Sequence, residues 1–130
     1  MLVQLYAPEE YWNCPKDLLD AITGGCGPGG LGDYLVPDTL WGLNVKPACK
    51  IHDFYYSEMM PGTIECKEEA DRVFLNNMIR IIKAVTDSKI LRVLRMRRAK
   101  TYYVMVKDFG GHAFWANKND DKNLRHVEVK

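Results

Sequence analysis

Long hydrophobic runs are missing from this chain of 130 residues. No segment approaches the roughly 18 consecutive apolar residues that a membrane-spanning helix requires, so we expect no transmembrane segment. The first ten residues lack both a basic start and a sustained apolar stretch, and no signal peptide is therefore predicted. Only 4 cysteines are present, too few for a disulfide scaffold, which leaves either a single bridge or four free thiols. Repeats are also absent, and the length favours one domain over residues 1–130.

The bulk composition is that of an ordinary globular protein, with 47% apolar and 27% charged residues. The formal net charge is only +1, but it is distributed unevenly. Residues 80–107 contain one acid, Asp87, and a series of bases: Arg80, Lys83, Lys89, Arg92, Arg95, Arg97, Arg98, Lys100 and Lys107. Such a block attracts the phosphates of lipids or nucleic acids, although it is also typical of a solvent-facing helix.

Helical signals dominate the chain, and we expect an all-α fold. The predicted helices are a short turn over 8–13, a helix from Pro15 to the pair Gly24-Gly25, and three longer ones over about 47–60, 65–85 and 89–108. Thr63 is predicted to cap the fourth of these, and Asp87 or Ser88 the fifth. The glycine-rich segment 25–45 is expected to be an ordered, functional loop. Strand signals are weak, with at most one short strand over 124–129.

One helix face carries the candidate chemistry. Cys49, His52, Asp53 and Tyr56 are spaced three or four residues apart within 47–60, so they share a face. Calcium prefers six to eight hard oxygen ligands, and backbone carbonyls serve as well as carboxylates. Alternate carbonyls of the segment Gly25–Gly29 can supply several, because glycine tolerates the dihedral angles required. Asp53 would add two carboxylate oxygens, and one acid predicts weak binding.

His52 would then stand beside the metal and could take a proton from water if a carboxylate held its second ring nitrogen. Asp71 is the best candidate for that carboxylate. It lies on the apolar face of the 65–85 helix, where an unpartnered charge would be costly.

Three segments of the chain together resemble the phospholipase A2 family. They are the glycine loop Cys26–Gly30, the run Cys49-Lys50-Ile51-His52-Asp53-Phe54-Tyr55-Tyr56, and the later Ala70-Asp71-Arg72. They look like the calcium loop, the active-site helix and the second catalytic helix of that family, over about residues 24–80. The short interval from His52 to Asp71 looks more like the small bacterial and parvovirus-capsid members. The resemblance implies two antiparallel central helices, a calcium-binding loop, and additional N- and C-terminal helices.

The resemblance also implies a metal site. Gly25, Gly27 and Gly29 would give carbonyl oxygens to Ca²⁺, and Asp53 its carboxylate. The backbone N–H of Gly27 would join calcium in stabilising the oxyanion. A disulfide between Cys26 and Cys49 is implied in the same way. The first carbonyl position, a tyrosine in the family, is Gly25 here, which matters little because only its carbonyl is used.

For catalysis, the resemblance implies that His52 is the general base and Asp71 its orienting partner. Tyr56 would bond towards Asp71. The implied reaction is calcium-dependent hydrolysis of the sn-2 acyl ester of glycerophospholipids at a membrane surface. Action is expected where calcium is abundant: outside cells, as a delivered effector, or in a viral or phage particle.

Three other interpretations stay open. The domain could keep a phospholipase-like fold as a lipid-binding or structural module without turnover. It could bind nucleic acid through Arg92, Arg95, Arg97 and Arg98, although nothing else in the chain favours this. A zinc site from Cys26, Cys49 and His52 is conceivable, but it lacks closely spaced cysteine pairs.

Overall fold

The fold is mostly helical. The computed structural model describes residues 2–23, 37–116, 118 and 125–129. These residues form six helices and one antiparallel hairpin: α1 (Glu9–Trp12), α2 (Lys16–Thr23), β1 (Thr39–Leu40), β2 (Leu43–Asn44), α4 (Lys46–Tyr56), α5 (Ile64–Val85), α6 (Lys89–Phe109) and α7 (Gly111–Ala116).

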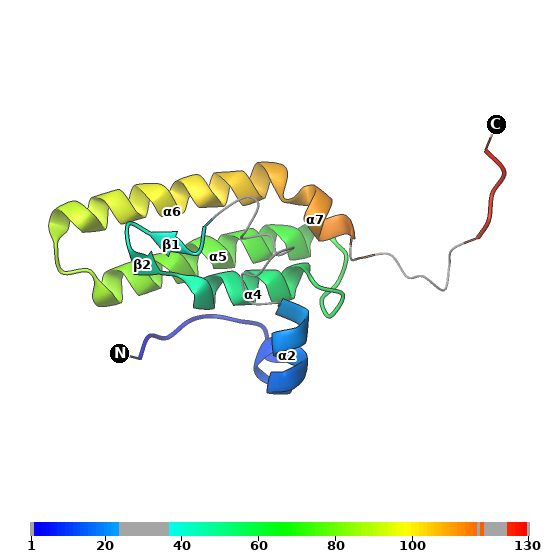
Figure 1. Ribbon diagram of the computed structural model, residues 1–130, viewed down its shortest axis with the longest axis horizontal. Coiled ribbons are helices and arrows are strands. Elements are labelled where there is room, and N and C mark those ends of the chain that lie inside the picture. Colours follow the sequence, from blue (N-terminus) through cyan, green and yellow to red (C-terminus); the bar gives the residue numbers. More distant parts are fainter. Residues whose placement is uncertain (1, 24–36, 117, 119–124, 130) are drawn as a thin grey trace.

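Helix α5 lies between α4 and α6 and packs against both (Figure 1). Helices α4 and α5 run antiparallel, because Tyr55 contacts Glu69 whereas His52, earlier on α4, contacts Asp71, later on α5. The antiparallel pair that the sequence predicts is therefore present.

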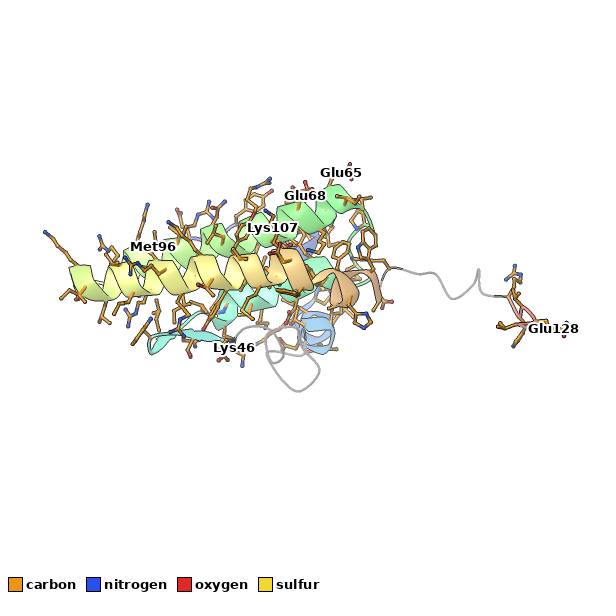
Figure 2. All side chains as sticks on the ribbon, turned by 90° about the horizontal axis from the view of Figure 1, so that it is seen from above. Lys46, Glu65, Glu68, Met96, Lys107 and Glu128 are labelled. Carbon is orange, nitrogen blue, oxygen red and sulfur yellow. The ribbon has the colours of Figure 1, made fainter. Side chains whose placement is uncertain are left out.

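Helix α6 returns along α5 in the opposite direction. Figure 2 shows Lys107, near the end of α6, beside the start of α5, which carries Glu65 and Glu68. The short α7 then continues past the end of α6 and contacts α4 as well. The ends of α4 and α6 and the start of α5 thus meet at one end of the layered helices.

Local sequence signals set most helix ends. The Thr63 side chain accepts a hydrogen bond from the Cys66 N–H at 3.0 Å, and Ser88 accepts one from the Leu91 N–H at 3.3 Å. Each satisfies a backbone donor that the first helical turn leaves unpaired. Helix α6 ends at Phe109, with Gly110 as its C-cap. The predicted Thr63 cap, the Ser88 alternative and the stop near Gly110 are confirmed.

Three predictions of secondary structure were wrong in detail. The helix predicted over 47–60 ends at Tyr56, because Ser57 takes an extended conformation. The segment 39–44, predicted as loop, forms the hairpin, and the described part of the predicted strand, 125–129, is not a strand. The hairpin turn places Trp41 at φ 49° and Gly42 at φ 79°. Positive φ at both central residues suits the twist of a two-residue hairpin, but tryptophan is an unusual choice there.

The core fills the space between α4, α5 and α6. The segments before and after these helices also pack against it. Its largest fully buried side chains include Phe54 on α4, Phe74 on α5 and Phe114 on α7. The N-terminal segment is tied down by Asn77, which accepts from the Tyr6 N–H and donates to the Tyr6 carbonyl. Within the described ranges, no helix is long and apolar enough to cross a membrane.

Candidate active site

His52 and Asp71 form a buried pair between α4 and α5. His52 Nε2 lies 2.8 Å from Asp71 Oδ1. The two residues are only 3% and 2% exposed. The sequence predicts this partnership, and the structure brings the two side chains together; their catalytic roles remain predictions.

Tyr56 completes the arrangement predicted on α4. Its hydroxyl donates to Asp71 Oδ1 at 2.7 Å, so that one carboxylate oxygen accepts from both the histidine and the tyrosine. The Tyr56 ring centroid lies 4.3 Å from that of the imidazole, and Phe74 lies 4.6 Å away. Both rings pack against the imidazole.

Lys67 is a partner of Asp71 that sequence reasoning missed. Its Nζ lies 2.7 Å from Asp71 Oδ2, and it also donates to the carbonyl oxygens of Val106 and Lys107 at 3.1 and 3.3 Å. The available signal was spacing, because Lys67 precedes Asp71 by four residues on a predicted helix.

The electrostatic environment favours a neutral histidine beside an ionised carboxylate. Burial lowers the pKa of His52, and the hydrogen bond that His52 donates to Asp71 only partly opposes this. Burial by itself would raise the pKa of Asp71, but hydrogen bonds from His52, Lys67 and Tyr56 outweigh it, and the pKa is lowered. Burial and the Asp71 charge raise the pKa of Tyr56, so its phenol stays protonated. A neutral imidazole that donates Nε2–H to Asp71 carries its lone pair on Nδ1.

Asp53 belongs to the same helix but not to the buried pair. It is half-buried, and its Oδ2 atom is shielded from solvent. The other predicted calcium ligands, the carbonyls of Gly25, Gly27 and Gly29, lie outside the described residues, as does the N–H of Gly27. Within the part of the chain that the structure describes, no three His, Cys, Asp or Glu side chains gather as a metal site. The predicted set of Asp53 and backbone carbonyls consists of hard oxygen donors, which suit calcium better than zinc.

The cysteines bear on two further predictions. Cys49 is buried on α4, and its implied partner Cys26 lies outside the described residues, as does part of the alternative zinc site. Cys14 and Cys66 are half-buried and free.

A second lysine fixes the C-terminal end of α4. Lys118 Nζ donates to the carbonyls of Tyr55, Ser57 and Met60, with lengths of 3.0 and 2.8 Å for Tyr55 and Met60. It also lies 4.6 Å from the Phe114 ring centroid. Cations at a helix C-terminus interact favourably with its dipole, and Lys118 thereby stabilises the C-terminal end of α4. Sequence reasoning had no signal for this contact, because Lys118 is remote from α4 in the chain.

Part of the basic block has a structural role. Arg95 donates to the carbonyls of Leu40 and Trp41 and to the Thr86 hydroxyl, and Arg92 donates to the Thr86 carbonyl. Two of the four arginines offered as nucleic-acid ligands therefore hold the hairpin and the α5–α6 connection.

Comparisons of this chain with protein-family models, with curated proteins and with solved structures found no match.

Proposed function

We propose that this protein is a calcium-dependent phospholipase A2, which hydrolyses the sn-2 acyl ester of glycerophospholipids. The observation that carries the proposal is the buried His52–Asp71 pair, 2.8 Å apart, with Tyr56 on the same carboxylate oxygen. A neutral, oriented imidazole with a free lone pair on Nδ1 is the chemistry that a general base for water requires. The substrate class is what the resemblance of the glycine loop and the two helices to the phospholipase A2 family implies.

In the proposed reaction, His52 Nδ1 takes a proton from water, and the resulting hydroxide attacks the ester carbonyl carbon. Asp71 holds Nε2–H and stabilises the imidazolium that forms. When the tetrahedral intermediate collapses, His52 returns the proton to the leaving glycerol oxygen. The products are a fatty acid and a lysophospholipid.

The residues proposed to hold calcium are Asp53 and the carbonyls of Gly25, Gly27 and Gly29. The hard oxygen donors of this set fit that ion. When bound, calcium would supply positive charge to the lipid phosphate and to the developing oxyanion. The Gly27 N–H would donate to the same oxyanion.

Phospholipid vesicles provide the direct test. Incubation in millimolar calcium should release fatty acid, and an excess of chelator should stop the release. If no fatty acid is released in millimolar calcium, the proposed phospholipase activity is excluded. If release is equal with chelator, the proposed calcium requirement is excluded.

Asp53→Asn should selectively weaken the binding of calcium. The variant removes the one carboxylate of the proposed site, so the calcium concentration for half-maximal hydrolysis should rise at least about tenfold, equivalent to about 1.4 kcal/mol. Calcium titration of the initial rate measures this. Asp87→Asn, which neutralises an exposed acid before α6, is the matched control and should leave the titration unchanged. An unchanged titration for Asp53→Asn would show that the metal assignment is wrong.

An anionic membrane surface is the proposed docking partner. Trp41 is 49% exposed at the hairpin tip, and the Arg98 guanidinium lies 5.2 Å from its ring centroid. An exposed tryptophan beside a basic side chain suits the lipid headgroup region, where the ring meets the acyl boundary and the cation meets phosphate. The remaining bases of α6 add attraction for anionic lipid.

Trp41→Asn should weaken binding to anionic vesicles about tenfold. Asparagine tolerates the positive φ at this position, so the hairpin is kept while the apolar ring is lost. Burying half of a large side chain contributes about 1.4 kcal/mol, which corresponds to that factor. Vesicle sedimentation measures it, with Trp115→Asn as the control, since Trp115 is 41% exposed on α7. Equal losses in the two variants would argue against a specific role for the hairpin.

A lipid-binding or structural module without turnover is the second candidate. It would bind the same vesicles and release no fatty acid. Nucleic-acid binding is less favoured, because Arg92 and Arg95 are engaged within the fold. Steeply salt-dependent DNA affinity without lipid hydrolysis would reverse that order.

A further inference from the structure

The Lys67 ammonium joins three structural elements at one point. An ammonium has three N–H donors. Lys67 Nζ has three acceptors within hydrogen-bonding distance: Asp71 Oδ2 on its own helix, and the carbonyls of Val106 and Lys107 on α6. Every donor is used, so this side chain has no proton left to offer a substrate. Any part it has in the reaction must come from its charge and its position.

The surroundings of Lys67 make that charge effective. Its side chain is only 13% exposed, and that of Asp71 is 3% exposed. The carbonyls of Val106 and Lys107 belong to the last turn of α6, where the helix dipole is negative. The ammonium therefore lies between a carboxylate and a helix terminus, both of which attract it, in a site where water screens little.

The Asp71 carboxylate is held at both oxygens as a result. Oδ1 accepts from His52 and Tyr56, and Oδ2 accepts from Lys67. Rotation about the terminal bond of an aspartate side chain is soft, so donors on one oxygen alone do not fix the plane of the carboxylate. With Lys67 on the second oxygen, the plane is fixed, and the direction of the His52 bond is fixed with it.

We propose that Lys67 is a positioning residue of the His52–Asp71 pair, which clamps the carboxylate of Asp71 to the C-terminal end of α6. This role rests on the proposed function, since the pair is positioned for that reaction. The clamp makes the end of α6 part of the active-site framework, although α6 supplies no side chain to the pair. Phe114 on α7 packs edge-on against Tyr56 at 5.0 Å between ring centroids, which adds a second link from the same end of the molecule.

The test compares Lys67→Met with Lys118→Met. Both variants remove an ammonium held by backbone carbonyls at a helix end, but only Lys67 contacts Asp71. The first readout is the downfield proton NMR signal of His52 Nε2–H, which needs no activity. We expect the signal to move or broaden in Lys67→Met, to stay in place in Lys118→Met, and to return towards its wild-type position in Lys67→Arg. An unmoved signal in Lys67→Met overturns the proposal.

The second readout is the rate of lipid hydrolysis. Lys67→Met should lower kcat about 10- to 100-fold with little change in KM, the range that loss of an outer hydrogen-bond partner has at metal-binding histidines. Lys118→Met should change kcat less than about threefold. Equal losses in the two variants overturn the proposal. If Lys67→Met does not fold, Lys67→Gln takes its place in the comparison with Lys118→Met, because the glutamine side chain keeps two N–H donors but has no charge. Wild-type protein that releases no fatty acid defeats the proposed function alone, and the NMR comparison then decides the role of Lys67.

Discussion

Fatty acid release should fall about 100- to 10,000-fold when His52 is replaced by glutamine, which is the range that general-base catalysis contributes. Glutamine can donate its amide N–H to Asp71 and has nearly the volume of an imidazole, so the buried site stays filled. It cannot take a proton from water at neutral pH. The loss should therefore appear in kcat, whereas binding to vesicles should stay as in the wild type.

The matched control for this prediction is His112→Gln. His112 is exposed on α7, and its replacement should leave the rate unchanged. Circular dichroism and urea unfolding would show that His52→Gln keeps the fold. A folded His52→Gln variant with wild-type kcat would rule out His52 as the base, and Asp71 would then be left with a structural role.

The helix starts around this site and its His52–Asp71 pair could be predicted from the sequence, because local interactions determine them. Thr63 and Ser88 are side chains that cap helices, and both do so. His52 and Asp71 could be paired because an acid on an apolar helix face needs a partner, and a histidine on a neighbouring helix offers one. In each case the deciding physics acts within a few residues, or between two adjacent helices joined by a short turn.

The parts that sequence reasoning missed depend on contacts between distant segments. Lys67 reaches the α6 carbonyls some forty residues away, and Lys118 reaches the end of α4 some sixty residues away. Backbone carbonyls at helix ends have no sequence signature, so nothing marks which lysine will meet them. The hairpin was missed for a different reason: Trp41 sits at positive φ, where tryptophan is rare, and Arg95 compensates by binding both carbonyls next to the turn.

The Asp71→Asn variant should lose about 3–5 kcal/mol of unfolding free energy, the cost of removing one partner from a buried charge pair. Asparagine has nearly the same shape, but its single oxygen cannot serve both sides of the site. If the oxygen faces His52 and Tyr56, the amide N–H groups face the Lys67 ammonium, donor against donor. That ammonium is also left without its counter-charge in a site that is largely shielded from water.

The sign of the pH dependence follows from the lowered pKa of Asp71. Ionised Asp71 stabilises the fold fully above the unfolded-state pKa of about 3.9, and this stabilisation is lost as the pH falls through the lower folded-state value. The gap between wild type and Asp71→Asn should thus be constant from neutral pH to about pH 5 and should shrink in stronger acid. Urea unfolding of the wild type and of Asp71→Asn at a series of pH values measures this difference in stability and its change in acid.

A double variant separates the lost charge pair from other damage. Asp71→Asn combined with Lys67→Met removes the unpaired ammonium and should recover at least about 1 kcal/mol relative to Asp71→Asn alone. Asp108→Asn, at an exposed acid at the end of α6, should change stability by no more than about 0.5 kcal/mol. If Asp71→Asn were equally mild, or if the double variant were simply additive, the carboxylate would not be the electrostatic link between His52 and Lys67. Such a result would count against the hydrogen-bond arrangement itself and not only against the proposed reaction.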